Sequence, residues 1–181
     1  MPLEEFILLG DALWLDFVNS AGGRTLDPPD LLLDADAYAR WAALQHLDVA
    51  GDLAPFAKIL QFRARLTELA VALHEGRQPP GGAVAALNEQ LGRSAGSHQL
   101  TRIGGEWRLR FAPARPLAAL EAIARSAAGT LAEARTVVRR CAGETCSLYF
   151  TDDSPTGSRR LCDPEACGQH VHVERRRGLR G

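Results

Sequence analysis

The chain has 181 residues, of which 46% are hydrophobic, 24% charged and only 6% aromatic. This composition excludes a collagen, a coiled coil and a fully disordered chain, and the length allows one compact unit with a small appendage. No stretch approaches the roughly 18 uncharged apolar residues of a membrane-spanning helix, and Glu4 and Glu5 stand where a signal peptide is basic. We therefore expect a cytoplasmic protein that is not inserted in a membrane.

Charge is balanced overall but unevenly distributed. The formal net charge is −1, with 13 basic and 16 acidic residues before Arg139 and 8 basic and 6 acidic residues from Arg139 onward. Lys58 is the sole lysine, so nearly all positive charge is guanidinium. Guanidinium suits recognition of phosphates and bases, although the choice of arginine can equally reflect the composition of the genome.

The first half of the chain has a helical period. Apolar residues at steps of three and four predict a first helix capped by Asp11 and ending by Gly22, a second from about Ala35 to His46, a third from Pro55 to His74 and a fourth from Ala83 to Gly92. In the third helix the apolar stripe excludes Arg63 and Arg65, which we expect on the outer face.

The period then changes to two, where Trp107, Leu109 and Phe111 alternate with arginines. With Gly104-Gly105 and the run from Leu100 to Ile103, this pattern predicts a β-hairpin. A helical stripe resumes from Leu117 to Val138 and predicts a long helix that runs toward the first cysteine and could pair two copies of the chain. The fold class we expect is mainly α with a small β-hairpin, an α+β arrangement.

All four cysteines lie in the last quarter of the chain, with the spacing Cys-x4-Cys-x15-Cys-x4-Cys. The chain therefore divides into a helical domain, residues 1–138, and a terminal module, residues 139–181. Two short chelating turns brought together by a hairpin offer four soft donors to a tetrahedral Zn²⁺ ion. The alternatives are two disulfides or four inert thiols, which the missing export pattern and the pairing of the cysteines beside Gly, Asp and Ser disfavour. The predicted ligands are Cys141, Cys146, Cys162 and Cys167.

Local signals predict how the module folds around these ligands. The stretch from Ser147 to Thr151 is typical of a strand, and residues 152–157 of a loop. Asp163-Pro164-Glu165 predicts an N-cap, a proline in the first helical position and an acid in the first turn, so that Cys167 lies in the first turn of a helix. The result is a treble-clef-like or ribbon-like zinc finger.

Basic residues flank the second cysteine pair and suggest contact with DNA. Arginine can hold phosphate or read guanine, and glutamine can read adenine with two hydrogen bonds. The alternative is a solvated basic segment whose arginines balance the charge of the thiolates. The predicted DNA contacts are Arg159, Arg160, Gln169, Arg175, Arg176 and Arg177.

These motifs resemble a known family. The run Leu13-Trp-Leu-Asp-Phe-Val-Asn19, the helical body and the terminal Cys-x4-Cys followed by Ser-Arg-Arg-Leu-Cys-x4-Cys-Gly are similar to bacterial proteins with an ABATE domain and a C-terminal CGNR zinc finger. The resemblance implies a stress-induced transcriptional regulator in which the finger binds DNA and the first domain is a sensor for a small-molecule effector. The family's Cys-Gly-Asn-Arg reads Cys167-Gly168-Gln169-His170 here, so a permanent positive charge is replaced. The aromatic residue expected before the third cysteine is Leu161.

The resemblance also draws attention to Asp16 and Asn19 on the first helix. Polar groups in an apolar stripe can line a ligand pocket, or their hydrogen bonds can fix a neighbouring loop. We do not expect an enzyme, because the chain lacks a phosphate loop and a nucleophile elbow, and a four-thiolate zinc has no open position for water.

Three functions are compatible with these observations. The first is a transcriptional regulator that contacts DNA through its zinc module. The second is a zinc-stabilised module for protein interaction or dimerisation without direct DNA binding, which the net charge and His170 favour. The third is a thiol redox switch in which oxidation releases the metal.

Overall fold

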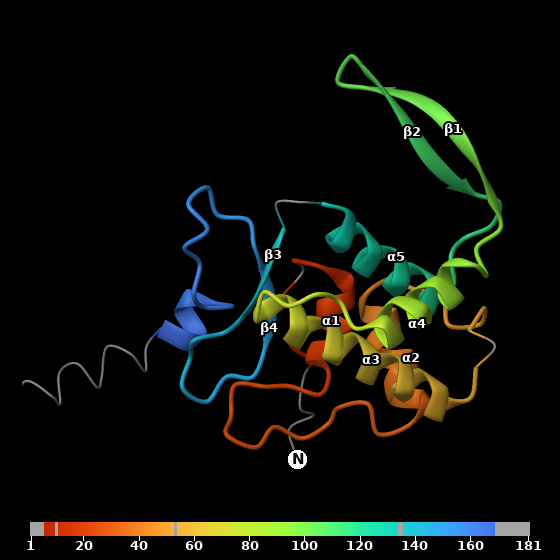
Figure 1. The fold of residues 1–181 in the computed structure, drawn as a ribbon. Coiled ribbons are helices and arrows are strands. Elements are labelled where there is room, and N and C mark those ends of the chain that lie inside the picture. Colours follow the sequence, from red (N-terminus) through yellow and green to blue (C-terminus); the bar gives the residue numbers. More distant parts are fainter. Residues whose placement is uncertain (1–5, 10, 53, 134–135, 169–181) are drawn as a thin grey trace, which may run out of the picture.

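The computed structural model describes residues 6–9, 11–52, 54–133 and 136–168. The described chain forms a helical body, a long β-hairpin that projects from it, and a terminal module at the opposite end (Figure 1). The α+β fold class predicted from the sequence is confirmed. The elements are α1 (Leu13–Asn19), α2 (Ala35–Leu44), α3 (Phe56–His74), α4 (Gly81–Leu91), β1 (Gly96–Ile103), β2 (Glu106–Pro113), α5 (Ala119–Ala132), β3 (Val137–Arg140) and β4 (Tyr149–Asp152).

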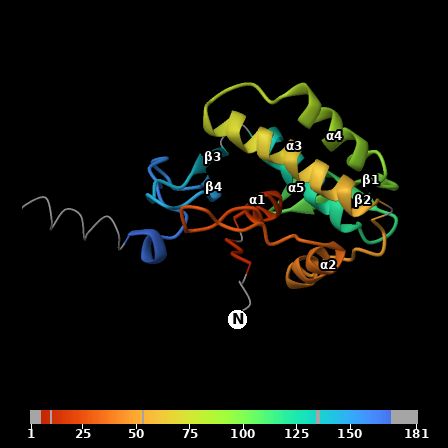
Figure 2. The same cartoon turned by 90° about the horizontal axis from the view of Figure 1, so that it is seen from below.

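Helix α1 lies in the middle of the body, against α3, α5 and β4 (Figure 2). Because neighbours surround it, its residues from Trp14 to Asn19 are all buried, polar ones included. The ring of Phe17 lies 5.1 Å from that of Trp41 and 6.4 Å from that of Phe62, measured between centroids. Burying such a side chain contributes about 1.5 to 3 kcal/mol, so this cluster is a main source of stability for the body.

The predicted second, third and fourth helices are confirmed, with ends that shift by no more than two residues. The cap predicted for the first helix is wrong. Ala12, not Asp11, is the N-cap of α1 and makes no side-chain capping bond. Asp11 instead pairs with Arg159 of the terminal module, at 2.9 Å.

The long helix predicted from Leu117 to Val138 is confirmed over Ala119–Ala132, but its continuation to Val138 is wrong. Helix α5 ends at Ala132, and Val137–Arg140 forms strand β3, which pairs antiparallel with β4. Thr136, Val137 and Val138 are β-branched and favour the strand once a partner strand is present. The apolar stripe of α5 is buried against α1 and α4 within the chain, so it offers no surface for a second copy.

Arg63 does not lie on the outer face as predicted. It is only 6% exposed, and its Nη1 donates to Ser20 Oγ at 2.8 Å and to Asp30 Oδ1 at 2.8 Å. A second hydrogen bond joins its Nη2 to Asp30 Oδ2. The fork of the guanidinium thus ties α3 to the loop that follows α1.

The hairpin is confirmed and longer than predicted, because β1 already begins at Gly96. Its turn is Gly104-Gly105, with φ values of +58° and +90° that favour glycine. Both strands are exposed along nearly all their length. Among the described residues, no helix is long and apolar enough to cross a bilayer.

Candidate metal centre

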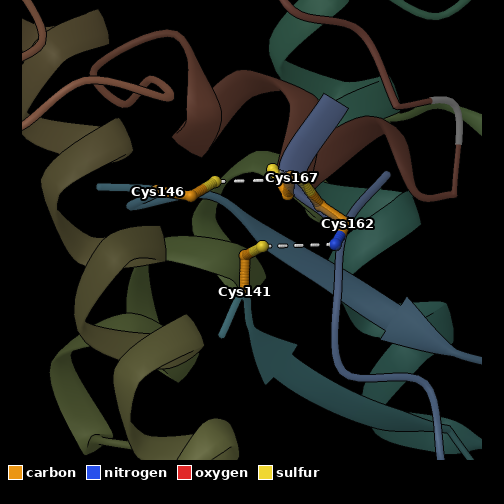
Figure 3. Close-up of side chains that lie close together, drawn as sticks. All are labelled: Cys141, Cys146, Cys162 and Cys167. Carbon is orange, nitrogen blue, oxygen red and sulfur yellow. Dashed lines mark hydrogen bonds between the residues drawn. The ribbon is translucent and has the colours of Figure 1, made fainter. Parts of the chain in front are cut away.

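The structure brings the four cysteines together in the terminal module (Figure 3). Cys141 follows β3, Cys146 follows a tight turn, Cys162 ends the loop after β4, and Cys167 lies in a short helix of residues 164–168. Their Sγ atoms all lie within 4.8 Å of one another. The Sγ of Cys162 is 3.8 Å from that of Cys146 and 3.6 Å from that of Cys167.

These distances fit a tetrahedral metal ion. With a metal–sulfur distance of about 2.3 Å, tetrahedral ligands lie about 3.8 Å apart, whereas a disulfide requires about 2.05 Å. Each cysteine is at most 6% exposed, and all four are free thiols. The donor set is therefore a closed four-sulfur metal site.

The first cysteine pair is shaped by backbone hydrogen bonds to sulfur. The N–H groups of Gly143 and Cys162 donate to Cys141 Sγ at 3.4 and 3.3 Å. A Cβ atom on Gly143 would lie 3.2 Å from Cys146 Cβ and 3.3 Å from Cys167 Cβ, so glycine lets this turn approach the site closely. The two hydrogen bonds fix the position of the Cys141 sulfur relative to the other three.

The second pair is built as the sequence predicts. Asp163 Oδ1 accepts from the N–H groups of Glu165 and Ala166 at 2.9 and 3.1 Å, and Pro164 opens the helix. The cap fixes the first helical turn, which places Cys167 toward the other three sulfurs.

Electrostatics also favour a cation at this site. Hydrogen bonds from Cys146 and then from Cys167, Cys141 and Arg24 lower the pKa of Cys162 to about 5, although burial opposes the shift. The hydrogen bond with Cys162, followed by burial, raises the pKa of Cys146, and burial followed by Cys162 raises the pKa of Cys167 to about 11. Four buried thiolates repel one another, so full ionisation requires a positive ion between them.

Comparison with known families matches the two parts of the chain separately. Residues 11–134 match the ABATE model, described as "putative stress-induced transcription regulator", and residues 138–178 match the CGNR zinc finger. The chain belongs to the ABATE family. A search among curated proteins gave no match.

The sequence did not identify Arg24, which belongs to the ABATE domain and contacts the zinc finger. Its Nη2 donates to Asp163 Oδ2 at 3.1 Å. Burial acts to lower the pKa of Arg24, but Cys162, Cys167 and Asp163 raise it overall. Arg24 therefore supplies positive charge beside the thiolates from a loop more than 130 residues away in the chain.

Arg159, predicted as a DNA contact, is half-buried and bonded to other groups of the protein. Its guanidinium stacks 4.5 Å above the ring of Phe150 and donates to the carbonyl oxygens of Thr151, Leu161 and Cys162 at 3.1, 3.2 and 2.6 Å. With the ion pair to Asp11, these contacts use the whole fork. We therefore assign Arg159 a structural role.

Arg160 differs from its neighbour. Its side chain is exposed and makes no hydrogen bond or ion pair with the described residues, while its carbonyl accepts from Ala142 N at 2.9 Å. Arg140, the last residue of β3, is exposed as well. The other predicted DNA contacts, Gln169, Arg175, Arg176 and Arg177, lie outside the described residues, as does His170.

Asp16 and Asn19 are each 2% exposed and are hydrogen-bonded to protein groups. Asn19 Nδ2 donates to the carbonyl of Tyr149 and its Oδ1 accepts from Tyr149 N, both at 2.9 Å. Asp16 accepts from Leu9 N at 2.8 Å and from Gln45 Nε2 at 2.9 Å. The sequence left two interpretations open, a ligand pocket or hydrogen bonds that fix neighbouring segments. These contacts match the second interpretation.

Asn19 belongs to a polar junction between the ABATE domain and the zinc finger. Ser147 N donates to Gly23 O at 2.9 Å, and Gly23 N donates to Ser147 Oγ at 3.0 Å. Thr145 Oγ1 donates to Arg24 O at 2.8 Å. The residues on both sides of Cys146 are thus hydrogen-bonded to the loop after α1.

A cavity of about 1050 Å³ lies between α5 and the loop after β4. Its lining includes Arg125, Thr130 and Glu133 from the ABATE domain and Asp153 and Ser154 from the zinc finger. Sequence reasoning could not find it, because its two walls are distant in the chain and carry no shared motif.

Proposed function

We propose that this protein is a cytoplasmic bacterial transcription regulator whose zinc finger contacts DNA. The observation that carries the proposal is the buried four-sulfur site, held in a module that is hydrogen-bonded to the ABATE domain. The two family matches support the same function.

The metal we propose is Zn²⁺, bound by Cys141, Cys146, Cys162 and Cys167. Four thiolates at tetrahedral spacing are a typical donor set for structural Zn²⁺, because its filled d shell imposes no other geometry. Its chemistry here is structural, since four protein ligands leave no position for water. We accordingly propose that the protein is not an enzyme.

For DNA contact we propose the exposed cations around the metal site. Arg140 and Arg160 lie on the zinc finger with exposed side chains, and Gln169 and Arg175 to Arg177 follow its last ligand in the sequence. The described arginines are suited to phosphate contacts, and the glutamine to reading a base.

The cavity between α5 and the zinc finger is the place we propose for an effector. A small polar molecule there would touch Arg125 and Glu133 on one side and Asp153 on the other. Because it contacts both parts, such a ligand could change how the finger is held, as a sensor of stress requires.

The test is binding of zinc-loaded protein to mixed double-stranded DNA at about 50 and 200 mM salt. We expect saturable binding that falls steeply with salt and is lost when all four cysteines are replaced by serine. Changing Arg160 to Glu together with Arg175 to Glu should weaken binding at least tenfold and flatten its salt dependence. The matched control pairs Arg65→Glu with Arg40→Glu, an equal charge change at exposed positions of α3 and α2, and should have little effect.

No binding at low salt by protein with one zinc per chain would contradict the proposal. It would favour the alternative in which the finger is a module for protein interaction. Equal loss of binding in the matched control would show that only overall charge matters, and would remove the assignment to the finger.

A further inference from the structure

The β1–β2 hairpin has two different faces. In its register Leu100 pairs with Leu109, Arg102 with Trp107 and His98 with Phe111, and paired residues share a face. We call Leu100, Trp107, Leu109 and Phe111 the apolar face. The opposite face carries Gln99, Thr101, Arg108 and Arg110.

The apolar face is bare over most of its length. Leu100, Trp107 and Leu109 are 67%, 69% and 66% exposed, whereas Phe111 at the base is covered by Arg125 of α5, 5.7 Å from its ring centre. The three exposed side chains leave roughly 400 Å² of apolar surface, the size of the largest patch on a typical monomer. An isolated two-stranded hairpin is also marginally stable in water, so a covering partner would stabilise it.

We propose that a second copy of the chain covers this face, with the two hairpins stacked face to face around a twofold axis. Stacking in opposite directions places the central Leu100–Leu109 pair on its counterpart. The tip pair, Arg102 and Trp107, then meets the base pair, His98 and Phe111, of the other copy. The exposed leucines of one copy then lie on those of the other, so the apolar part of the face is complementary to itself.

The arrangement of charge and shape supports a second copy over DNA as the partner. Arg108 and Arg110 lie on the opposite face, so stacking does not bring them together. The hairpin projects from the end of the molecule away from the zinc finger (Figure 1). A ribbon of eight residues per strand spans roughly 26 Å, which keeps the two bodies at opposite ends of the stacked pair.

The area predicts how strong the association is. Two such faces cover roughly 800 Å² of apolar surface in total, below the roughly 1,600 Å² of a standard interface. We therefore expect a reversible dimer that forms at high protein concentration, not an obligate one. The inference does not depend on DNA binding by the finger.

Sedimentation equilibrium of the full zinc-loaded chain over a hundredfold concentration range tests the proposal. We expect the wild type to move from monomer to dimer, and the double variant L100S/L109S to stay monomeric. R108S/R110S changes the same number of side chains on the other face and should still dimerise. Zinc content and thermal midpoint should match the wild type in both variants, because none of these residues belongs to the core.

Trp107 gives a second readout that locates the interface. Trp14 and Trp41 are fully buried and Trp107 is exposed, so acrylamide quenches mainly Trp107. Quenching should fall as the dimer forms. The proposal would be overturned if the wild type stayed monomeric or if L100S/L109S still formed the dimer. It would also be overturned if Trp107 were equally quenchable in the monomer and the dimer. Loss of DNA binding in R108S/R110S of a monomeric protein would instead make the hairpin a DNA-binding arm.

Discussion

The ABATE domain and the zinc finger each have a buried interior but are held together differently. The domain buries an extensive core around Trp14, Phe17 and Trp41, whereas the finger buries little beyond Leu148, Phe150 and its four cysteines. A module this small lacks the apolar area to fold alone, so its ligands have to replace a core. Within one chain, therefore, the stability of one region depends on a buried apolar core and the stability of the other on metal binding.

The largest expected effect separates these two sources of stability. Replacing Cys162 by Ser should remove one of four ligands and with it most of a binding free energy that is about 10 kcal/mol or more for structural zinc. We expect less than one zinc per chain by elemental analysis and rapid proteolysis after residue 136, while the helical circular dichroism persists.

The matched variant in the other region is Phe17→Ala. It deletes a fully buried ring and should reduce the free energy of unfolding of the domain by about 3 to 5 kcal/mol, with zinc content unchanged in the folded protein. If C162S unfolded the helices, or if Phe17→Ala released zinc below its unfolding midpoint, the two regions would not be independently stabilised.

A smaller effect tests the junction between the regions. Asn19→Ala should leave the N–H and carbonyl of Tyr149 without partners and cost about 2 to 4 kcal/mol in urea unfolding. Asn88→Ala, at an exposed position of α4, is the control and should cost less than about 0.5 kcal/mol. A cost for Asn19→Ala no larger than this control would mean that the junction does not couple the two regions.

Local patterns account for what the sequence could predict. The apolar stripe of α3 and the N-cap at Asp163 each depend on residues that are only a few positions apart in the sequence. The two cysteines of each chelating pair are likewise close together in the sequence. Strand β3 could not be predicted, because Val138 also continues a helical stripe and only pairing with β4 decides between the two.

The missed polar residues share a cause. Arg24 and Arg63 find their partners at Asp163 and Asp30, which are 139 and 33 residues away. Nothing in a single sequence connects such pairs, and an arginine beside an apolar stripe usually lies in solvent. The exposure of Trp107 could not be predicted either. A period of two in the sequence predicts one apolar face of a strand, but it does not say whether another part of the chain covers that face.

The smallest expected effect is a pH dependence within the ABATE domain. Burial acts to raise the pKa of Asp30, but hydrogen bonds from Arg63 and from the N–H of Leu32 lower it overall. A carboxyl whose pKa is lower in the folded chain than in the unfolded chain stabilises the folded protein at pH values above the unfolded pKa, about 3.9. This contribution is lost as the pH falls through the folded pKa. The Asp30 side chain is 42% exposed, so solvent screens much of the effect.

We expect Asp30→Asn to be less stable than the wild type at pH 7 by about 1 kcal/mol, and the difference to shrink below about pH 4 as Asp30 of the wild type becomes protonated. Urea unfolding between these pH values measures it. Asp27→Asn, on the same loop with an exposed carboxyl, is the control and should change the free energy of unfolding at pH 7 by less than about 0.5 kcal/mol. A gap that widens as pH falls would mean that Asp30 is better stabilised in its protonated form, and the ion pair with Arg63 would then not be what ties α3 to the loop after α1.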